Sequence, residues 1–160
     1  MYRPPAPADH PMNAVVVQPA AVLLPDGVGG LADAAEAEGL RVVSTVIDRW
    51  VDGTQRFAAP GESLLIARAD GEAIAIGGLA HCPNVAGALR VRRFYVHPSW
   101  RRRGVARTLV QQLIEGGLRH TDTLTCNARA SAAAPPFWES LGFAAVDLEG
   151  ITHVRHVSGG

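Results

Sequence analysis

The sequence contains no lysine, little cysteine and no net charge. All fifteen of its Lys+Arg residues are arginines, a usage that coding bias explains as well as chemistry does. The formal net charge is zero and the pI is near 7.0, which argues against a general nucleic-acid binder because such proteins usually carry an excess of basic residues. Seven of the fifteen arginines nevertheless fall between Arg90 and Arg107, and coding bias does not explain where residues are placed.

Long apolar runs are also missing. No run approaches the roughly eighteen residues that a membrane span needs, and the N-terminal segment MYRPPAPADHPM lacks the apolar core of a signal peptide. The two cysteines, Cys82 and Cys126, lie far apart among strand-like residues. We therefore expect buried free thiols rather than a disulfide, in a cytoplasmic protein that makes no contact with a membrane.

The length and composition suit a single domain. The chain has 160 residues, of which 48% are hydrophobic, enough for a sizeable core. We expect one domain from residue 13 to residue 157, between disordered tails at residues 1–12 and 158–160. The predicted order is a strand, two helices, three strands, a helix, a strand, a helix and two strands: 13–19, 31–39, 40–53, a hairpin across 63–80, 89–96, 104–116, 122–127, PPFWESLGF, 143–147 and 151–157. This order predicts an α/β (α+β) fold in which helices cover a mixed sheet.

Two of these assignments depend on residue patterns that need an argument. The β-branched residues in 40–53 favour a strand, but the apolar residues recur at helical spacing, and over fourteen residues we give more weight to the period: Leu40, Val43, Val46, Ile47, Trp50 and Val51. The pair Asp70-Gly71 joins two apolar runs, as is typical of a hairpin turn. Both runs are nearly continuous in apolar residues, so we expect both faces of the sheet to be covered.

Consecutive arginines lie where a strand meets a helix. In YVHPSWRRRGVARTLVQQLI, residues 95–114, Arg101 to Arg103 precede Gly104, and an amphipathic helix follows. The first backbone N–H groups of a helix have no internal partner and lie at the positive end of its dipole. A phosphate binds readily there, and a glycine lets it approach the backbone closely. The alternative is a solvated surface loop, and RRRG alone does not decide between the two.

Two motifs resemble those of the GNAT acetyltransferase superfamily. FYVHPSWRRRGVARTLV is similar to its cofactor-binding segment, Arg/Gln-x-x-Gly-x-Gly/Ala after a strand, with Arg101, Gly104 and Ala106 at the three specified positions. PFWESLGF is similar to its second motif, an aromatic pair followed by Leu-Gly-Phe. RFAAPGE and IGGLA also resemble segments that some relatives share. The resemblance extends over about residues 13–157. It implies a mostly antiparallel sheet of about seven strands, with the central strands 89–96 and 123–127 splayed apart.

The resemblance also implies a cofactor, acetyl-CoA, and the residues that hold it. Main-chain N–H groups of residues 101–107 would bind the pyrophosphate, and a backbone N–H near Val96 would stabilise the oxyanion. The implied cofactor-binding residues are Phe94, Tyr95, Val96, Arg101, Arg102, Arg103, Gly104, Val105, Ala106, Arg107, Asn127, Ser131 and Trp138. The implied reaction is direct acetyl transfer, without a metal, to a small amine or to an amino group of a protein.

The sequence departs from the family pattern at positions that bear on catalysis. Trp138 stands where many relatives carry a tyrosine that protonates the departing thiolate, and an indole N–H is not a usable acid. Ser131 stands where an asparagine that contacts the cofactor is common. His81 and Glu62 are the candidate general bases, although a strand-end and a loop role explain them more simply. A non-catalytic acyl-CoA-binding module is therefore the alternative function, and the sequence allows a monomer or a homodimer.

Overall fold

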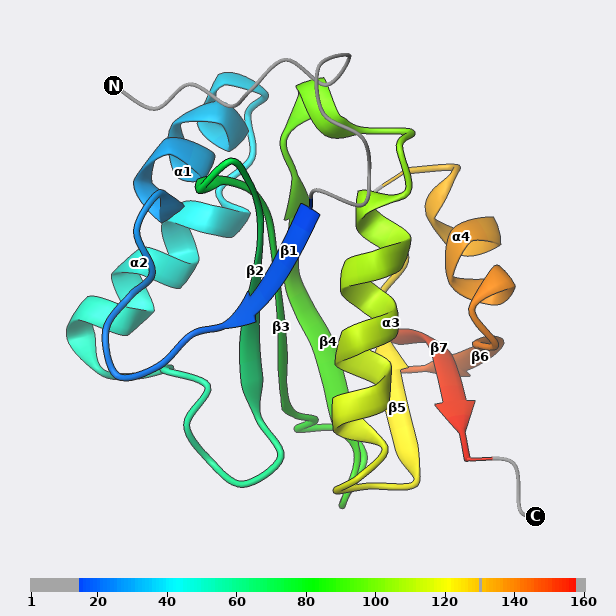
Figure 1. The fold of residues 1–160 in the computed structure, drawn as a ribbon. Helices are drawn as coiled ribbons and strands as arrows, with labels where there is room; N and C mark the ends of the chain where they lie inside the picture. Colours follow the sequence, from blue (N-terminus) through cyan, green and yellow to red (C-terminus); the bar gives the residue numbers. More distant parts are fainter. Residues whose placement is uncertain (1–14, 130, 158–160) are drawn as a thin grey trace.

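The computed structural model describes residues 15–129 and 131–157. Within them, seven strands form one sheet in the order β1-β2-β3-β4-β5-β7-β6 (Figure 1). Neighbouring strands are antiparallel except β4 and β5, which are parallel. The strands are β1 (Val15–Pro19), β2 (Ser63–Ala69), β3 (Glu72–His81), β4 (Leu89–Val96), β5 (Thr123–Cys126), β6 (Ala144–Leu148) and β7 (Ile151–His156). The mixed sheet predicted from the sequence is confirmed. The predicted tails lie outside the described residues.

Helices pack on both faces of the sheet. α1 (Val28–Ala37) and α2 (Val42–Asp52) cover one face, and α3 (Val105–Gly117) and α4 (Ala134–Ser140) cover the other (Figure 1). The side chains of β2 show this arrangement, because Leu64 and Ile66 pack with α1 and α2. Their neighbours point the opposite way, toward α3. In β3, every residue from 73 to 80 is buried, which confirms that both faces are covered.

The ambiguous segment 40–53 is a helix over most of its length. Val43, Val46 and Trp50 face the sheet and are buried, as the helical period predicted. Leu40 precedes α2 and Val51 lies on its outer side, and they are 44% and 74% exposed. The apolar stripe is therefore narrower than the sequence pattern suggested.

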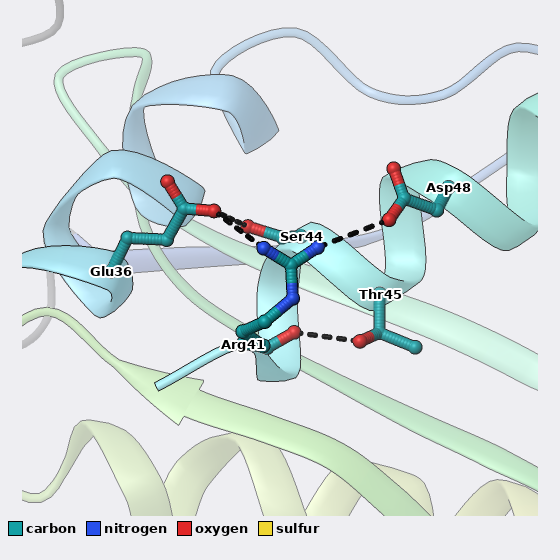
Figure 2. A network of polar contacts seen from close by, with 5 residues as sticks. All are labelled: Glu36, Arg41, Ser44, Thr45 and Asp48. Carbon is teal, nitrogen blue, oxygen red and sulfur yellow. Dashed lines mark hydrogen bonds and ion pairs between the residues drawn. The ribbon is translucent and has the colours of Figure 1, made fainter. Parts of the chain in front are cut away.

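Polar contacts fasten the start of α2 to α1 (Figure 2). The Arg41 guanidinium donates to Glu36 Oε1 and to Asp48 Oδ2, at 3.2 Å in both cases. The hydroxyl of Ser44 donates to the same Glu36 oxygen at 2.6 Å, and that of Thr45 donates to the carbonyl of Arg41 at 2.8 Å. These contacts hold α1 against α2, and the loop between the two helices borders the cavity described below through Glu38 and Leu40.

A bulge bends β4 in its second half. Ile76 of β3 pairs with Tyr95, but Gly78 pairs with Arg92, so two residues of β4 lie opposite one residue of β3. Arg93, inside the bulge, has a left-handed φ of 58°. The first half of β4 pairs with β5 at only two positions, opposite residues 124 and 125. Beyond them the two strands separate, which confirms the predicted splay.

Two adjacent glycines of β3 leave room for aromatic rings because they have no Cβ atom. A Cβ on Gly77 would lie 3.0 Å from Phe94 Cδ2, on the α3 side of the sheet. A Cβ on Gly78 would lie 2.4 Å from Phe57 Cε1, on the α1–α2 side. Phe57 is buried and has a φ of 52°. The segments RFAAPGE and IGGLA are therefore in contact here, because the Phe57 ring of the first packs on Gly78 of the second.

Both cysteines are free and buried, as the sequence predicted. Across the described ranges, no helix combines the length and apolar character that crossing a membrane requires. The same residues include no group of three or more His, Cys, Asp or Glu side chains that could hold a metal ion.

Candidate functional site

The corner between β4 and α3 presents unpaired backbone amides. A 3₁₀ turn, Pro98–Trp100, leads into residues with alternating handedness, including Arg102 at φ 61° and Gly104 at φ 81°. No side chain in the part of the chain that the structure describes caps the start of α3. The N–H groups of residues 102–107 make no hydrogen bond with any described residue. Such a concavity of amides, at the positive end of a helix dipole, is a binding site for an anion.

The arginines predicted to bind phosphate differ in their contacts, as Arg102, Arg103 and Arg107 show. Arg102 and Arg103 are exposed and make no ion pair with the described residues. Arg107 instead joins α3 to α4, because its guanidinium donates to Ser140 Oγ at 2.7 Å and lies over the Phe137 ring. The amide concavity therefore carries two free guanidinium groups beside it.

Arg101 serves a different contact from the one expected. Its Nε donates to the Val96 carbonyl at 3.1 Å, and its two Nη atoms bind both carboxylate oxygens of Glu38 at 2.6 and 2.7 Å. Tyr95 also donates its hydroxyl to Glu38. The Arg101 hydrogen bonds, followed by the Tyr95 bond, lower the pKa of the Glu38 carboxyl. Arg101 thus fastens the corner to the end of α1, and its guanidinium is not aimed at the amides.

A cavity of about 660 Å³ lies between the splayed strands and reaches both faces of the sheet. Its lining includes eight residues that the sequence predicted: Phe94, Tyr95, Val96, Arg101, Ala106, Asn127, Ser131 and Trp138. Sequence reasoning missed the others: Glu38, Leu40, Val91, Arg92, Arg93, Cys126, Ala133, Ala134 and Phe137. Arg92 had a signal, because the alternate arginines Arg90 and Arg92 in LRVRRFYV must share one face of a central strand. Arg93 had none, since it lies in the bulge, where strand alternation is interrupted.

The backbone of Val96 faces the gap between the strands. The N–H of His97 donates to the Ile74 carbonyl at 2.8 Å. Hydrogen-bonded and non-hydrogen-bonded pairs alternate in an antiparallel ladder, so the next pair, Val96 with Ala75, is of the second kind. The Val96 carbonyl accordingly bonds to Arg101 instead of β3. The Val96 N–H points away from β3 in the same way, into the space that β5 leaves open.

Trp138 forms part of the cavity wall on the α4 side. It is 6% exposed and makes edge-to-face contacts with the rings of Phe94, Phe137 and Phe143 at centroid distances of 6.1, 5.3 and 5.2 Å. Aromatic packing therefore fixes its ring beside the gap, at the position where the sequence comparison expected an acid.

The predicted candidate bases lie elsewhere. The N–H of His81 donates to Glu62 Oε2 at 2.9 Å, so the two residues do meet. His81 pairs with Leu89, at the end of β4 that is closed by pairing with β5. Roughly 20 Å of strand separates that end from Val96. Neither residue lines the cavity, and we do not include them in the proposal below.

Asn127 and Ser131 lie on the β5 side of the cavity. Asn127 donates from Nδ2 to the carbonyl of Gly150 at 3.3 Å, and its Oδ1 accepts from the N–H of Arg129 at 3.1 Å. These bonds hold the end of β5 against the β6–β7 turn. Ser131 is exposed. Both side chains therefore border the gap while Asn127 also supports its shape.

Comparison with known proteins gives a consistent result. Residues 31–157 match a family model described as an acetyltransferase (GNAT) domain. No curated protein sequence matches the chain. The family match covers the corner, both splayed strands and α4.

Solved structures share the fold at low sequence identity. A candidate acetyltransferase from Exiguobacterium sp. 255-15 is 24% identical, with a TM-score of 0.78 over 89% of this chain and 93% of that one. The Salmonella typhimurium protein yncA, crystallised with its cofactor acetyl-CoA, is 16% identical, with a TM-score of 0.69 over 92% and 96%. The Escherichia coli ribosomal-protein-S18-alanine N-acetyltransferase is 17% identical, with a TM-score of 0.66 over 91% and 96%.

Proposed function

The chain belongs to the GNAT acetyltransferase family, and from that premise we propose that it transfers the acetyl group of acetyl-CoA directly to an acceptor amine. The observation that carries this proposal is the continuity of the unpaired amides at residues 102–107 with the cavity between β4 and β5, through Ala106. An anion-binding corner that opens into an apolar-lined gap suits a ligand with a diphosphate at one end and a reactive group at the other.

The residues present fit acetyl-CoA. The amides at the start of α3 and the free guanidinium groups of Arg102 and Arg103 would bind its pyrophosphate. The backbone edge of β4 from Phe94 to Val96, which β5 does not pair with, would bind the amide groups of its pantetheine arm. The likeness to yncA, which was crystallised with acetyl-CoA, supports this choice.

The residues around the gap would contribute a hydrogen-bond donor to the transfer, but no nucleophile and no strong base. Acetyl-CoA supplies a thioester carbonyl, and the Val96 N–H would donate to its oxygen as negative charge develops there. Burial raises the pKa of the Cys126 thiol to about 12, so this thiol stays protonated at neutral pH and is a poor nucleophile. Direct attack by the amine is therefore favoured over an acetyl-cysteine intermediate. Glu38, with its lowered pKa, is a weak base, and we infer that the amine's proton leaves through water.

Calorimetry with acetyl-CoA tests the binding half of the proposal, and thiol release across a panel of amines tests the chemical half. We expect saturable binding and amine-dependent release. Saturable binding without release for any amine would favour the alternative, a non-catalytic acyl-CoA-binding module, which Trp138 motivates. Absence of saturable binding would rule out both functions.

Trp138→Tyr should raise turnover if protonation of the departing thiolate limits the rate. A phenol can donate the proton that an indole cannot, and one positioned acid is worth roughly tenfold or more. Trp138→Phe is the matched control, because it shrinks the ring in the same way without adding a hydroxyl. Steady-state kcat for both variants is the measurement. Equal values would show that a missing acid does not limit this protein.

Arg101→Ala should weaken the fold more than it weakens the binding of acetyl-CoA. The ion pair with Glu38 is partly exposed, at 42% and 29% of the two side chains, so we expect urea unfolding to show a loss of about 1 kcal/mol. Arg103→Ala is the matched control and should do the reverse, with a Kd for acetyl-CoA raised by roughly tenfold and an unchanged unfolding free energy. A large loss of affinity in Arg101→Ala with unchanged stability would contradict this assignment.

The contribution of this ion pair should depend on pH. The folded-state pKa of Glu38 lies below its usual value of 4.5, so the unfolded chain takes up the proton first as the pH falls. The stabilisation is therefore complete above pH 4.5 and is lost as the pH falls through the lower folded-state pKa. The stability difference between the wild type and Arg101→Ala should shrink over that range.

A further inference from the structure

Four arginines gather on the α1–α2 face of the splayed strands. Arg90, Arg92 and Arg93 come from β4, and Arg49 comes from α2, which packs on β4. Their charges lie close enough to act on one another, since Arg49 and Arg90 both disfavour the charged forms of Arg92 and Arg93. We call these four residues the β4 arginine cluster.

Within the described residues, no carboxylate forms an ion pair with the β4 arginine cluster, although Asp52 and Glu62 act at longer range on Arg49 and Arg92. None of the four guanidinium groups makes a hydrogen bond or an ion pair with the described residues. The Nε atoms of Arg90 and Arg92 are buried and have no hydrogen-bond partner in residues 15–129 and 131–157. Glu62 exerts only the weakest of the influences on Arg92, and its carboxylate oxygens already accept from backbone N–H groups.

Two other arginines, in contrast to the cluster, are paired with carboxylates. Arg41 binds Glu36 and Asp48 (Figure 2), and Arg101 binds both oxygens of Glu38. The guanidinium groups of Arg41 and Arg101 thus contact carboxylates, whereas those of the β4 arginine cluster contact none among the described residues.

Leaving these cations unpaired costs free energy. Burial, followed by the charges of the neighbouring arginines, lowers the pKa of Arg93 to about 10, and burial also lowers the pKa of Arg92. Both remain charged at neutral pH. A half-buried cation without a partner is destabilising, and an arriving anion would relieve the repulsion. The planar guanidinium is suited to a carboxylate or a phosphate.

Arg92 and Arg93 line the same cavity as the Val96 backbone, and roughly 10 Å of strand separates Arg93 from Val96. The amide corner at residues 102–107 belongs to α3, which packs on the opposite face of the sheet. The cluster is therefore placed on the side of the gap opposite the proposed pyrophosphate site. A ligand group bound to the cluster would approach Val96 from the face of the sheet opposite the proposed pyrophosphate site, where an acceptor would have to enter.

We infer that the acceptor is a small amine that also carries an acidic group, which Arg92 and Arg93 bind while Arg90 and Arg49 add to the positive field. This inference rests on the proposed transferase function. A cavity of about 660 Å³ must also hold part of the acyl donor, so the space left suits a small amino carboxylate.

The kinetic test compares amines of equal length that differ in their far end. We expect kcat/KM to be roughly tenfold or more higher for 4-aminobutanoate than for butylamine, because charge-assisted hydrogen bonds to the carboxylate are worth that much. Comparing kcat/KM for 3-aminopropylphosphonate with that for 4-aminobutanoate shows whether the site prefers a phosphonate or a carboxylate. The variants Arg92→Gln and Arg93→Gln should lose most of the preference through KM. Arg119→Gln, an exposed arginine at the end of α3, should retain it.

Two binding measurements separate this inference from the proposed function. With saturating CoA present, 4-aminobutanoate should raise the Tm of the wild type by about 2–4 °C but not that of the Arg92→Gln/Arg93→Gln variant. Both single variants should bind CoA as tightly as the wild type, and relief of repulsion should leave their Tm equal or higher. If 4-aminobutanoate raised the Tm but no amine were turned over, the β4 arginine cluster would still be an anion-binding site and the proposed transferase function would be wrong.

Three results would overturn the inference. One is equal kcat/KM for butylamine and 4-aminobutanoate in the wild type. Another is the absence of any Tm response to either acidic amine. The third is a weakened affinity for CoA in Arg92→Gln or Arg93→Gln, since the cluster would then belong to the donor.

Discussion

Gly104→Val should reduce the affinity for acetyl-CoA by roughly 100-fold or more. Gly104 has a φ of 81° immediately before α3 begins, a conformation that a β-branched residue adopts only at a cost of about 1–3 kcal/mol. The corner would relax toward ordinary backbone angles, which turns some of its amides away from the anion. Losing two charge-assisted hydrogen bonds of about 1.5–3 kcal/mol each accounts for that loss of affinity.

The matched control for this variant is Gly116→Val. Gly116 lies in the same helix, at the end far from the corner, and a Cβ there meets nothing within 4 Å. Calorimetry with acetyl-CoA should give a nearly unchanged Kd for Gly116→Val and a greatly raised one for Gly104→Val. A Gly104→Val protein that folds and binds acetyl-CoA with normal affinity would exclude the amide corner as the pyrophosphate site.

Gly78→Val should destabilise the protein by about 3 kcal/mol, near the upper end for an overpacked core. Even a single added carbon would lie 2.4 Å from Phe57 Cε1. The Phe57 ring cannot simply swing aside, because it is buried among the side chains of α2 and β2. Its backbone is also held, since the Phe57 N–H donates to Gln55 Oε1 at 2.7 Å. Urea unfolding would measure the change in free energy.

A double-mutant cycle tests whether the Phe57 ring is the cause. Gly29→Val adds the same side chain in α1 where nothing lies within 4 Å, and it should cost far less. Combining Gly78→Val with Phe57→Leu should cost less than the two single changes added together, because the smaller side chain leaves room. Additive costs would show that strain in β3 itself, and not the ring, explains the loss.

Local patterns in the sequence predicted nearly every element of the fold. The hairpin turn at Asp70-Gly71 was recognisable because both residues suit positive φ, and the structure has 49° and 80° there. The start of α3 was recognisable from its glycine and the apolar stripe that follows. Such features depend on residues within one or two turns of each other, which a single sequence displays directly.

Contacts between distant residues could not be predicted in this way. Arg101 matched a family motif and was interpreted as a phosphate ligand, but its guanidinium binds Glu38, 63 residues away. No local pattern marks Glu38 as that partner. His81 was considered as a base because it follows the hairpin, and Glu62 because it lies between the first helices and the hairpin, where acceptor loops occur in this fold. Their distance from the gap depends on which end of β4 pairs with β5, a register that the sequence does not reveal.

The gap between β4 and β5 leaves a row of strand N–H and C=O groups without a neighbouring strand. Open edges of this kind invite extended segments of other polypeptides, and proteins commonly discourage such pairing with charged side chains and bulges. β4 has both where it separates from β5, namely its arginines and the bulge that contains Arg93. Such features discourage pairing with another strand, and the unpaired groups of β4 would still be open to a narrow ligand that carries amide groups, such as the pantetheine arm of the proposed donor.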